Sequence, residues 1–269
     1  MNEQCTPNTE NRKVVMNTKL PADLNERVVI VTGAGTGIGR ATARAFANAG
    51  ANVLAVGRRI DALKETAAGH LSIAVHSADL RAQETAEGVI ATAVERWGHL
   101  DVLVNNAGIF RRMPLADTDP AAVTALFDLH VLAPTLLAQA ALPHLRRSKG
   151  TIVNISSTYG HKAAPNAAHY AASKAAVEHL TRSWAVELAP EGIRVNAVAP
   201  GPTESEALAA AGLPDEAIEQ AKKAEAALIP LGRRGEPEEV AEWIVRFSDP
   251  AITWLTGQVL TVDGGLELV

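Results

Sequence analysis

TGAGTGIG, residues 32–39, stands directly after a short β-branched run and directly before an Ala-rich helical pattern. Four glycines within seven residues let the chain turn tightly from a strand into a helix. Backbone N–H groups at a helix N-terminus, together with the helix dipole, bind phosphate. The spacing G-x-G-x-x-G fails in every register, whereas T-G-x-x-x-G-x-G matches. We therefore predict that Gly33, Gly37 and Gly39 bind a dinucleotide pyrophosphate; the alternative is an ordinary flexible loop.

Outward from this turn, short β-branched runs alternate with longer amphipathic Ala-rich stretches, which indicates successive β-α-β units. The expected strands are Val28–Thr32, Asn52–Val56, Ser72–His76, Asp101–Asn105, Thr151–Ser156, Arg194–Ala199 and Gln258–Val262. The expected helices are Gly37–Asn48, Ile60–Ala68, Gln83–Trp97, Ala121–Arg147, Ala168–Leu188 and Pro237–Phe247. Several strands are apolar almost throughout, as strands covered on both faces are. We predict an α/β fold with a seven-stranded, parallel, doubly wound sheet between two layers of helices.

Composition excludes several classes of partner. Thirty acidic against 25 basic residues give a net charge of −5, which argues against nucleic acid. The single cysteine, Cys5, excludes an intrachain disulfide and a thiolate metal cluster, and it favours a cytoplasmic location. The eight histidines form no H-E-x-x-H pair, so we expect no metal site. Residues 129–145 lack Asp, Glu, Lys and Arg, but they contain two His, a Gln and two Pro and fall short of the ~18 continuous apolar residues of a membrane span, so we expect no membrane partner.

The chain is predicted to form one domain behind a short leader. Residues 1–26 are polar and have no apolar core of a secretory signal, so we expect a disordered leader. Residues 27–269 then form a single dinucleotide-binding domain. Within it, residues 202–231 carry three prolines and no strand pattern. We predict a substrate lid there, the alternative being a plain surface insertion.

The end of the second expected strand bears on the choice of dinucleotide. An NAD site shows an acidic residue there, which binds the ribose hydroxyls. This chain instead has Gly57 followed by Arg58 and Arg59. A guanidinium at this place favours the 2′-phosphate of NADP(H), although NAD(H) stays an alternative and the arginines could be solvated surface charges.

A second group of residues suggests redox chemistry. Tyr170 and Lys174 are four residues apart in a helical stretch and share one face. An ammonium near a phenol favours the phenolate, so we expect Lys174 to lower the pKa of Tyr170. Taken alone, the pair could be an ordinary surface contact. Ser157, however, lies thirteen residues before Tyr170 at the carboxyl edge of a strand, where open α/β sheets bind ligands.

These motifs occur in one order: the glycine turn, Asp79, the run 105–108, Ser157, Tyr170 with Lys174, and Pro200-Gly201. In this the chain resembles the short-chain dehydrogenase/reductase family, over residues 27–265. The resemblance implies a Rossmann fold and a catalytic triad of Ser157, Tyr170 and Lys174. Ser156 is the alternative serine, at a spacing of fourteen. The motifs and the resemblance together predict that the cofactor contacts Gly33, Thr36, Gly37, Ile38, Gly39, Arg58, Arg59, Asp79, Leu80, Asn106, Ala107, Gly108, Tyr170, Lys174, Pro200, Gly201 and Thr203.

One position departs from the family pattern. His130 stands where the family usually carries an Asn that supports a proton relay to the lysine. We interpret His130 either as a catalytic relay residue or as a buried histidine that hydrogen-bonds the backbone. His161 and His169, which flank the triad in sequence, are either substrate contacts or ordinary loop residues.

The resemblance, together with the arginines that follow Gly57, predicts an NADP(H)-dependent oxidoreductase that interconverts a small-molecule ketone and a secondary alcohol, with 3-oxoacyl thioesters among the candidate substrates. The substrate is expected between Phe110, residues 158–168 and the segment 202–231. Alternatives are an NAD-linked alcohol or sugar dehydrogenase and a non-catalytic cofactor-binding protein. The family also implies a homotetramer or homodimer formed through the two long helices around the fifth strand.

Overall fold

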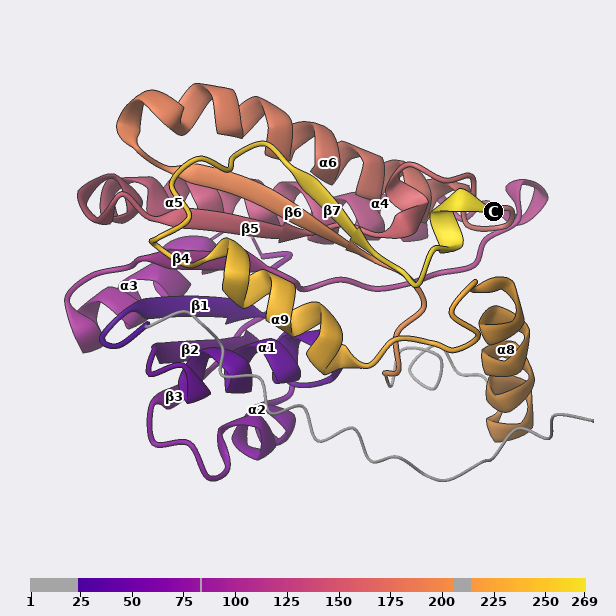
Figure 1. Cartoon of the computed structure of the whole chain (residues 1–269), viewed down its shortest axis with the longest axis horizontal. Helices are drawn as coiled ribbons and strands as arrows, with labels where there is room; N and C mark the ends of the chain where they lie inside the picture. Colours follow the sequence, from indigo (N-terminus) through magenta and orange to yellow (C-terminus); the bar gives the residue numbers. More distant parts are fainter. Residues whose placement is uncertain (1–23, 83, 206–213) are drawn as a thin grey trace, which may run out of the picture.

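The computed structural model describes residues 24–82, 84–205 and 214–269. Seven parallel strands form one sheet in the order β3-β2-β1-β4-β5-β6-β7 (Figure 1). They are β1 Val28–Thr32, β2 Asn52–Gly57, β3 Ile73–Ser77, β4 Val102–Asn105, β5 Thr151–Ile155, β6 Arg194–Pro200 and β7 Val259–Val262. The order reverses between β1 and β4, which is the switch point where doubly wound sheets bind their ligands. The predicted sheet is confirmed, and the predicted strand ends differ from these by one residue at most.

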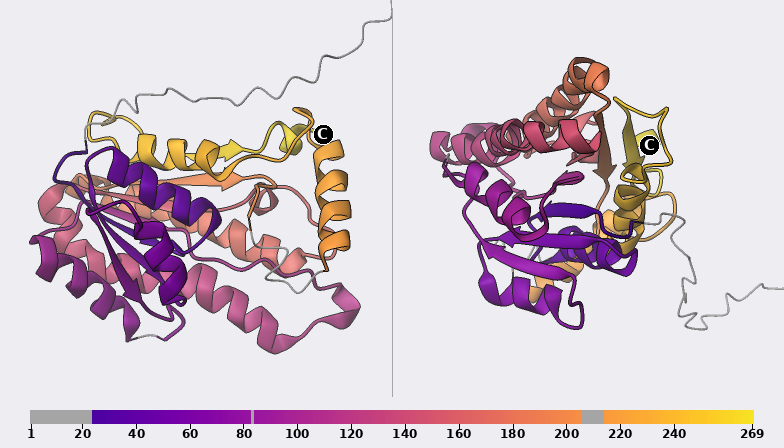
Figure 2. Two further views of the ribbon diagram at one scale, coloured as in Figure 1. Left: turned by 90° about the horizontal axis from the view of Figure 1, so that it is seen from below. Right: turned by 90° about the vertical axis from the view of Figure 1, so that its left-hand side faces the viewer.

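Helices cover both faces of the sheet because alternate strand residues point in opposite directions (Figure 2). Val29 and Val31 pack with α1 and α9, whereas Val28 and Ile30 pack with α3, α5 and α6. The α-helices are α1 Gly37–Asn48, α2 Ile60–Ala67, α3 Thr85–Trp97, α4 Pro120–Phe127, α5 Ala133–Ser148, α6 Ala168–Leu188, α8 Asp215–Leu228 and α9 Pro237–Phe247. This three-layer arrangement is the predicted one.

The predicted continuous helix over 121–147 is wrong in one respect. A π-helical turn, Asp128–Leu132, separates α4 from α5. Pro134 has no N–H to donate to the carbonyl of His130 four residues earlier, so a regular α-helical hydrogen bond cannot form there. The wider turn carries His130, whose side chain is buried.

The run Pro120–Ser148 is long and apolar enough to cross a membrane by length and composition, and 39% of its most apolar window is buried. Leu137, Ala141 and Leu145 of this run belong to the core beneath the sheet. Packing against the sheet therefore accounts for the apolar face of α5.

The predicted lid region contains α8, which stands beyond the carboxyl ends of the strands in both figures. Lys222 of α8 contacts Glu204 at 2.8 Å, and Arg234 contacts the same carboxylate at 2.9 Å. Arg234 also pairs with Glu225 of α8. These ion pairs fasten α8 to the segment that follows β6. The remaining part of the predicted lid, residues 206–213, and the predicted leader up to residue 23 lie outside the described residues.

Candidate active site

Ser157 is positioned by the end of β5. The strand stops at Ile155, and Ser157 caps the short 3₁₀ turn Thr158–Gly160. The Ser157 hydroxyl oxygen accepts a hydrogen bond from the Tyr159 N–H at 3.2 Å, and the Gly160 N–H donates to the Ser157 carbonyl at 2.7 Å. The serine is 7% exposed. The turn therefore fixes its hydroxyl at the carboxyl edge of the sheet, as predicted from the sequence.

Helix α6 brings Tyr170 and Lys174 to the same edge. Tyr170 lies in the first turn of α6, and the Lys174 Nζ is 5.9 Å from the centroid of its ring. The Lys174 ammonium donates to the Ile155 carbonyl at 2.8 Å, which ties the helix to the end of β5. The Tyr170 hydroxyl lies close enough to the Ser157 side chain for that serine to lower the pKa of the phenol. The three residues that the sequence singled out thus meet in one place.

Burial dominates the electrostatics of this group. It raises the pKa of Tyr170, and the hydrogen bond with Ser157 offsets only part of that effect. The expectation that Lys174 lowers the pKa of Tyr170 is not met in the ligand-free chain. Burial also lowers the pKa of Lys174 to about 8. The phenol is therefore protonated at neutral pH, which is the form that donates a proton.

The two neighbouring serines differ in their partners. The Ser156 hydroxyl is 2.9 Å from Glu178 Oε1 and 3.2 Å from the Lys174 carbonyl oxygen, and its side chain is buried. Those contacts use its hydroxyl within the protein. Ser157 is the serine whose hydroxyl meets Tyr170, so the geometry favours Ser157 over Ser156.

We expect Ser157→Ala and Ser156→Ala to separate catalysis from stability. Removing a donor to a developing oxyanion lowers kcat by about a hundredfold or more, which is the expected effect of Ser157→Ala. Ser156→Ala leaves buried Glu178 with one partner fewer and lowers the free energy of unfolding by about 1–3 kcal/mol. Steady-state kinetics and urea unfolding of both variants check this. Equal loss of kcat in the two variants would contradict the assignment.

The glycine turn forms a cradle at the N-terminus of α1. Gly33 and Gly37 have φ of +66° and +51°, which side-chain-bearing residues rarely adopt. A Cβ on Gly39 would lie 2.2 Å from the Gly33 carbonyl oxygen. Thr36, the N-cap of α1, makes no side-chain cap, and the first turn holds no acidic residue. The cradle leaves room and backbone N–H donors for a pyrophosphate, so the residues present fit the predicted dinucleotide.

Residues 33–267 match the family model described as Enoyl-(Acyl carrier protein) reductase. Across 91% of this chain and 99% of the relative, the sequence is 36% identical to a 3-oxoacyl-[acyl-carrier-protein] reductase of Thermotoga maritima. It is 39% identical to a cis-4-hydroxycyclohexanecarboxylate dehydrogenase of Sinomonas cyclohexanicum, over 91% of this chain and 98% of that one. A solved short-chain dehydrogenase/reductase of Caenorhabditis elegans with cofactor superposes with a TM-score of 0.86 at 35% identity, covering 92% and 97% of the two chains.

The chain belongs to the short-chain dehydrogenase/reductase family. It is therefore an NAD(P)-dependent oxidoreductase acting on CH–OH groups.

Among the described residues, no group of three His, Cys, Asp or Glu side chains could hold a metal ion.

The adenosine end of this dehydrogenase/reductase's predicted cofactor site lies where β2 and β3 end. Arg58 and Arg59 are exposed just after β2, and the Arg58 carbonyl accepts from Ser77 at 3.2 Å. Asp79 forms a two-point ion pair with Arg81, which lowers its pKa to about 2. Leu80 beside it is 8% exposed.

The segment after β4 is hydrogen-bonded to the start of the glycine turn. The Asn106 side chain donates to the Thr32 carbonyl at 2.8 Å, while the N–H groups of Asn106 and Ala107 donate to the Thr32 hydroxyl. A Cβ on Gly108 would lie 3.1 Å from His130 Nε2 and 3.6 Å from Lys174 Nζ. Asn106, predicted as a cofactor contact, thus also holds two loops together.

His130 has both ring nitrogens engaged. Its Nε2 accepts from the Ile109 N–H at 3.0 Å, which leaves Nδ1 as the protonated nitrogen. Nδ1 donates to the Ser173 hydroxyl at 2.8 Å, which donates to the Tyr170 carbonyl at 2.7 Å. Burial, with a smaller effect of Lys174, lowers the pKa of His130 to about 2. Of the two interpretations, this geometry supports the buried histidine that hydrogen-bonds the backbone; the catalytic relay stays a prediction.

The other two histidines near the triad differ from each other. Both ring nitrogens of His161 are paired with carboxylates of the protein, Glu178 and Glu267, which favours the loop-residue interpretation over a substrate contact. His169 Nδ1 is buried and has no hydrogen-bond partner among the residues that the structure describes. Phe110, predicted to line the substrate site, packs edge-on against Tyr170 with ring centroids 5.0 Å apart.

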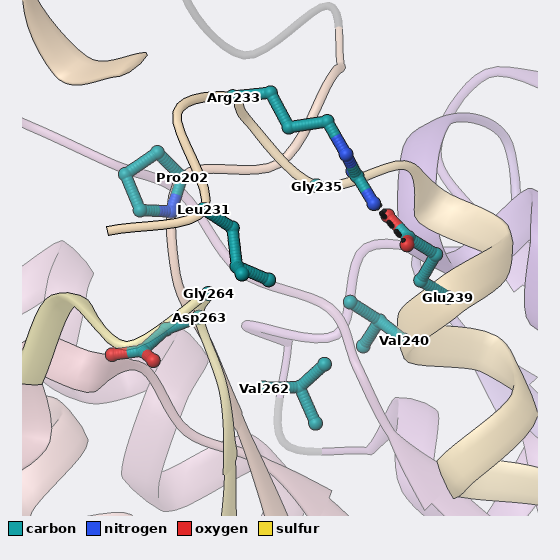
Figure 3. A pocket seen from close by; sticks show the side chains of 9 residues that line it. All are labelled: Pro202, Leu231, Arg233, Gly235, Glu239, Val240, Val262, Asp263 and Gly264. Atoms are coloured by element: carbon teal, nitrogen blue, oxygen red, sulfur yellow. Dashed lines mark hydrogen bonds and ion pairs between the residues drawn. The ribbon is translucent and has the colours of Figure 1, made fainter. Parts of the chain in front are cut away.

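The segment after β6 borders a pocket of about 120 Å³ (Figure 3). Leu231 and Val262 point into it, and Arg233 pairs with Glu239 at its rim. Gly201, next to Pro200 at the end of β6, packs so closely on Asp263 that a Cβ would lie 2.6 Å from the Asp263 Cβ. The Thr203 hydroxyl donates to the Gly201 carbonyl at 3.0 Å. Ser157, Tyr170 and Lys174 do not line this pocket.

Sequence reasoning missed the residues that support the triad. Ser173 contacts both His130 and the Tyr170 carbonyl, and the Ile109 N–H contacts His130. Asp263 accepts from the Thr158 hydroxyl at 3.0 Å across 105 residues. No spacing pattern indicates such pairs. Ser173 alone carried a signal, because a serine three residues after Tyr170 can donate to its carbonyl.

Proposed function

We propose that this dehydrogenase/reductase uses NADP(H) to interconvert a ketone and a secondary alcohol. The meeting of Ser157, Tyr170 and Lys174 at the same edge of the parallel sheet as the glycine turn is the observation that carries the proposal. When bound, the cofactor supplies or accepts the hydride at the carbonyl carbon. The non-catalytic alternative is disfavoured because all three groups are present and in contact range.

Each group has a part in reduction. The Ser157 hydroxyl, held by its turn, donates to the ketone oxygen, and the protonated Tyr170 phenol supplies the proton that completes the alcohol. Lys174 is anchored on Ile155 and presents a buried ammonium close to the phenol. That ammonium would bind the ribose hydroxyls of the cofactor. In oxidation the same groups move the proton in the opposite direction.

The predicted site residues stand together as a proposal for cofactor binding. The glycine turn and the N-terminus of α1 would hold the pyrophosphate. Asp79 and Leu80 would border the adenine, residues 106–108 would line the central edge, and Pro200, Gly201 and Thr203 would approach the nicotinamide. Arg58 and Arg59 would receive the 2′-phosphate, since both are exposed at the end of β2 and Gly57 leaves no acidic group to repel it.

Two substrate classes follow from the relatives' names. The match to a 3-oxoacyl-[acyl-carrier-protein] reductase favours a 3-oxoacyl ketone, and the match to a hydroxycyclohexanecarboxylate dehydrogenase favours an alicyclic alcohol. The edge-on ring of Phe110 beside Tyr170 gives the site an apolar, aromatic wall, which suits either class. A lid built on α8 would close over this site. We further propose a cytoplasmic homo-oligomer, formed through the α4–α5 run and α6.

Cofactor oxidation and reduction over a substrate panel tests the proposal. NADPH and NADH would be offered with 3-oxoacyl thioesters, cyclohexanones and quinones, and NADP⁺ and NAD⁺ with the matching alcohols and with sugars. The proposal expects NADPH-linked ketone reduction. Tight cofactor binding without turnover on any member of the panel would favour the non-catalytic alternative, and an NAD-only reaction would favour the alcohol or sugar dehydrogenase.

Arg58→Ala is expected to weaken NADPH binding by about ten- to a hundredfold, because a charge-assisted hydrogen bond to the phosphate is worth ~1.5–3 kcal/mol. NADH binding serves as the internal control and should stay unchanged, since NADH lacks that phosphate. Fluorescence titration of both nucleotides measures the effect. A parallel loss for both would place Arg58 outside the phosphate site.

A further inference from the structure

His161 directly follows the turn that Ser157 caps, and its ring lies between two carboxylates. Nδ1 is 2.9 Å from Glu178 Oε1, and Nε2 is 2.7 Å from Glu267 Oε2. An ionised carboxylate only accepts hydrogen bonds, so both ring nitrogens have to donate. A neutral imidazole has one N–H, whereas an imidazolium has two. The geometry therefore requires the charged form of His161.

The surroundings of the ring agree with a cation. The Glu178 side chain is 3% exposed and comes from α6, and a buried carboxylate without a cation would be costly. Its other oxygen is 3.4 Å from Arg182 Nη2, which is half-exposed. Glu267 comes from the last 3₁₀ turn, Leu266–Leu268, and its carboxylate also accepts from the Thr261 hydroxyl at 2.8 Å.

Two other charged residues near the ring, Asp263 and Lys162, have hydrogen-bond partners of their own. The Asp263 carboxylate accepts hydrogen bonds from the N–H groups of Gly265 and Glu267 and from the Thr158 hydroxyl. Lys162 donates to the carbonyl of Leu266 at 2.8 Å and to that of Val269, so its ammonium lies on the same C-terminal turn. His161 and Arg182 are thus the cations that contact Glu178, and His161 is the one that also reaches Glu267.

Gly160 makes the contact with Glu178 feasible. A Cβ at this position would lie 2.4 Å from Glu178 Oε1 and 2.7 Å from the Ser156 hydroxyl oxygen. Only the absence of a side chain lets α6 approach the turn closely enough for its carboxylate to meet the imidazole.

We propose that protonated His161 is a positioning residue that ties the Ser157 turn to α6 and to the C-terminal turn, and thereby holds the Ser157 hydroxyl where a ketone oxygen binds. The turn is short, and its own hydrogen bond from the Gly160 N–H to the Ser157 carbonyl transmits any displacement of His161 to Ser157. The effect on catalysis rests on the proposed function. The contacts of His161 with Glu178 and Glu267, which we call the tie, do not depend on it.

The tie depends on pH in a defined direction. Burial by itself lowers the pKa of His161, but the hydrogen bonds and charges of Glu178 and Glu267 outweigh it, so the net pKa is raised above its ordinary value. A group with a raised pKa in the folded state contributes stability that is complete below its ordinary pKa of 6.5 and is lost as the pH rises through the raised value. The tie is therefore intact in mildly acid solution and weakens on the alkaline side.

Nuclear magnetic resonance titration of the full chain with labelled histidine tests the charge state without any turnover. His161→Gln identifies the signal. We expect His161 to titrate above the ordinary histidine value of 6.5, and Glu267→Gln to lower its pKa by about one pH unit. Glu187→Gln, which removes an exposed charge from α6, is the matched control and should change nothing. Titration of His161 at or below 6.5, or no effect of Glu267→Gln, overturns the proposal.

Two readouts of His161→Gln test the positioning itself. Amide hydrogen exchange should speed up at residues 158–162 and 263–269, with α1 unaffected. With a ketone substrate, KM should rise by about tenfold while the cofactor Kd stays unchanged, and Glu267→Gln should move the alkaline limb of kcat/KM to lower pH. Unchanged exchange, or the wild-type alkaline limb in Glu267→Gln, overturns the proposal. If no ketone is reduced but the titration and exchange behave as expected, the proposed function fails and the tie stands.

Discussion

Tyr170→Phe is expected to lower kcat for ketone reduction by about a thousandfold, because general acid catalysis by one side chain contributes about 10²- to 10⁴-fold. The substitution removes the one hydroxyl that meets Ser157 and leaves the ring in place against Phe110 and His130. The fold should therefore survive, with a free energy of unfolding close to that of the wild type. Single-turnover kinetics at saturating cofactor measure the loss directly.

Tyr159→Phe is the matched control for this experiment. Tyr159 is the only other tyrosine in the chain, and it follows Ser157 by two residues. Its backbone N–H, rather than its hydroxyl, contacts Ser157. Tyr159→Phe should keep most of the activity, and cofactor Kd should stay within experimental error in both variants. Retained turnover in Tyr170→Phe would remove Tyr170 from the chemistry and leave a nucleotide-binding protein.

The fold was predictable because its signals are local. Continuous apolar strands, helical periodicity and glycines at one strand-to-helix turn define each element within a short window of sequence, and parallel connection follows from their alternation. The break at Asp128–Leu132 was missed, since the surrounding residues read as one apolar helix. Pro134 was the available signal, because a proline removes a hydrogen bond to the residue four positions earlier.

The positions of the three triad residues were also predictable from local sequence spacing, whereas the pKa of Tyr170 was not. Spacing placed Tyr170 and Lys174 on one face and Ser157 at the edge of β5, which the structure brings together. Spacing could not show that the Lys174 ammonium would donate to the Ile155 carbonyl, nor that burial would raise the pKa of Tyr170. Burial and long-range contacts, such as that between Thr158 and Asp263, are properties of the packed chain.

Gly39→Ala is expected to abolish detectable cofactor binding. The new Cβ would lie 2.2 Å from the Gly33 carbonyl oxygen and 2.5 Å from the Asn106 Nδ2, so the turn and the segment after β4 would both have to move. Those two segments are joined by the hydrogen bonds of Asn106 to the Thr32 and Gly33 carbonyls, and displacing them tilts the N–H groups of α1 away from the pyrophosphate. Calorimetric titration with NADPH and NADH measures the loss.

Gly88→Ala separates this effect from the general cost of altering a glycine. Gly88 lies inside α3, has no atom within 4 Å of an added Cβ, and has ordinary helical backbone. Alanine there should leave cofactor affinity unchanged and stabilise the fold by about 0.5–1 kcal/mol, because glycine is a poor helix former. If Gly39→Ala bound cofactor as tightly as Gly88→Ala, the pyrophosphate would have to bind elsewhere, and the triad would no longer face the nicotinamide that the turn is proposed to position.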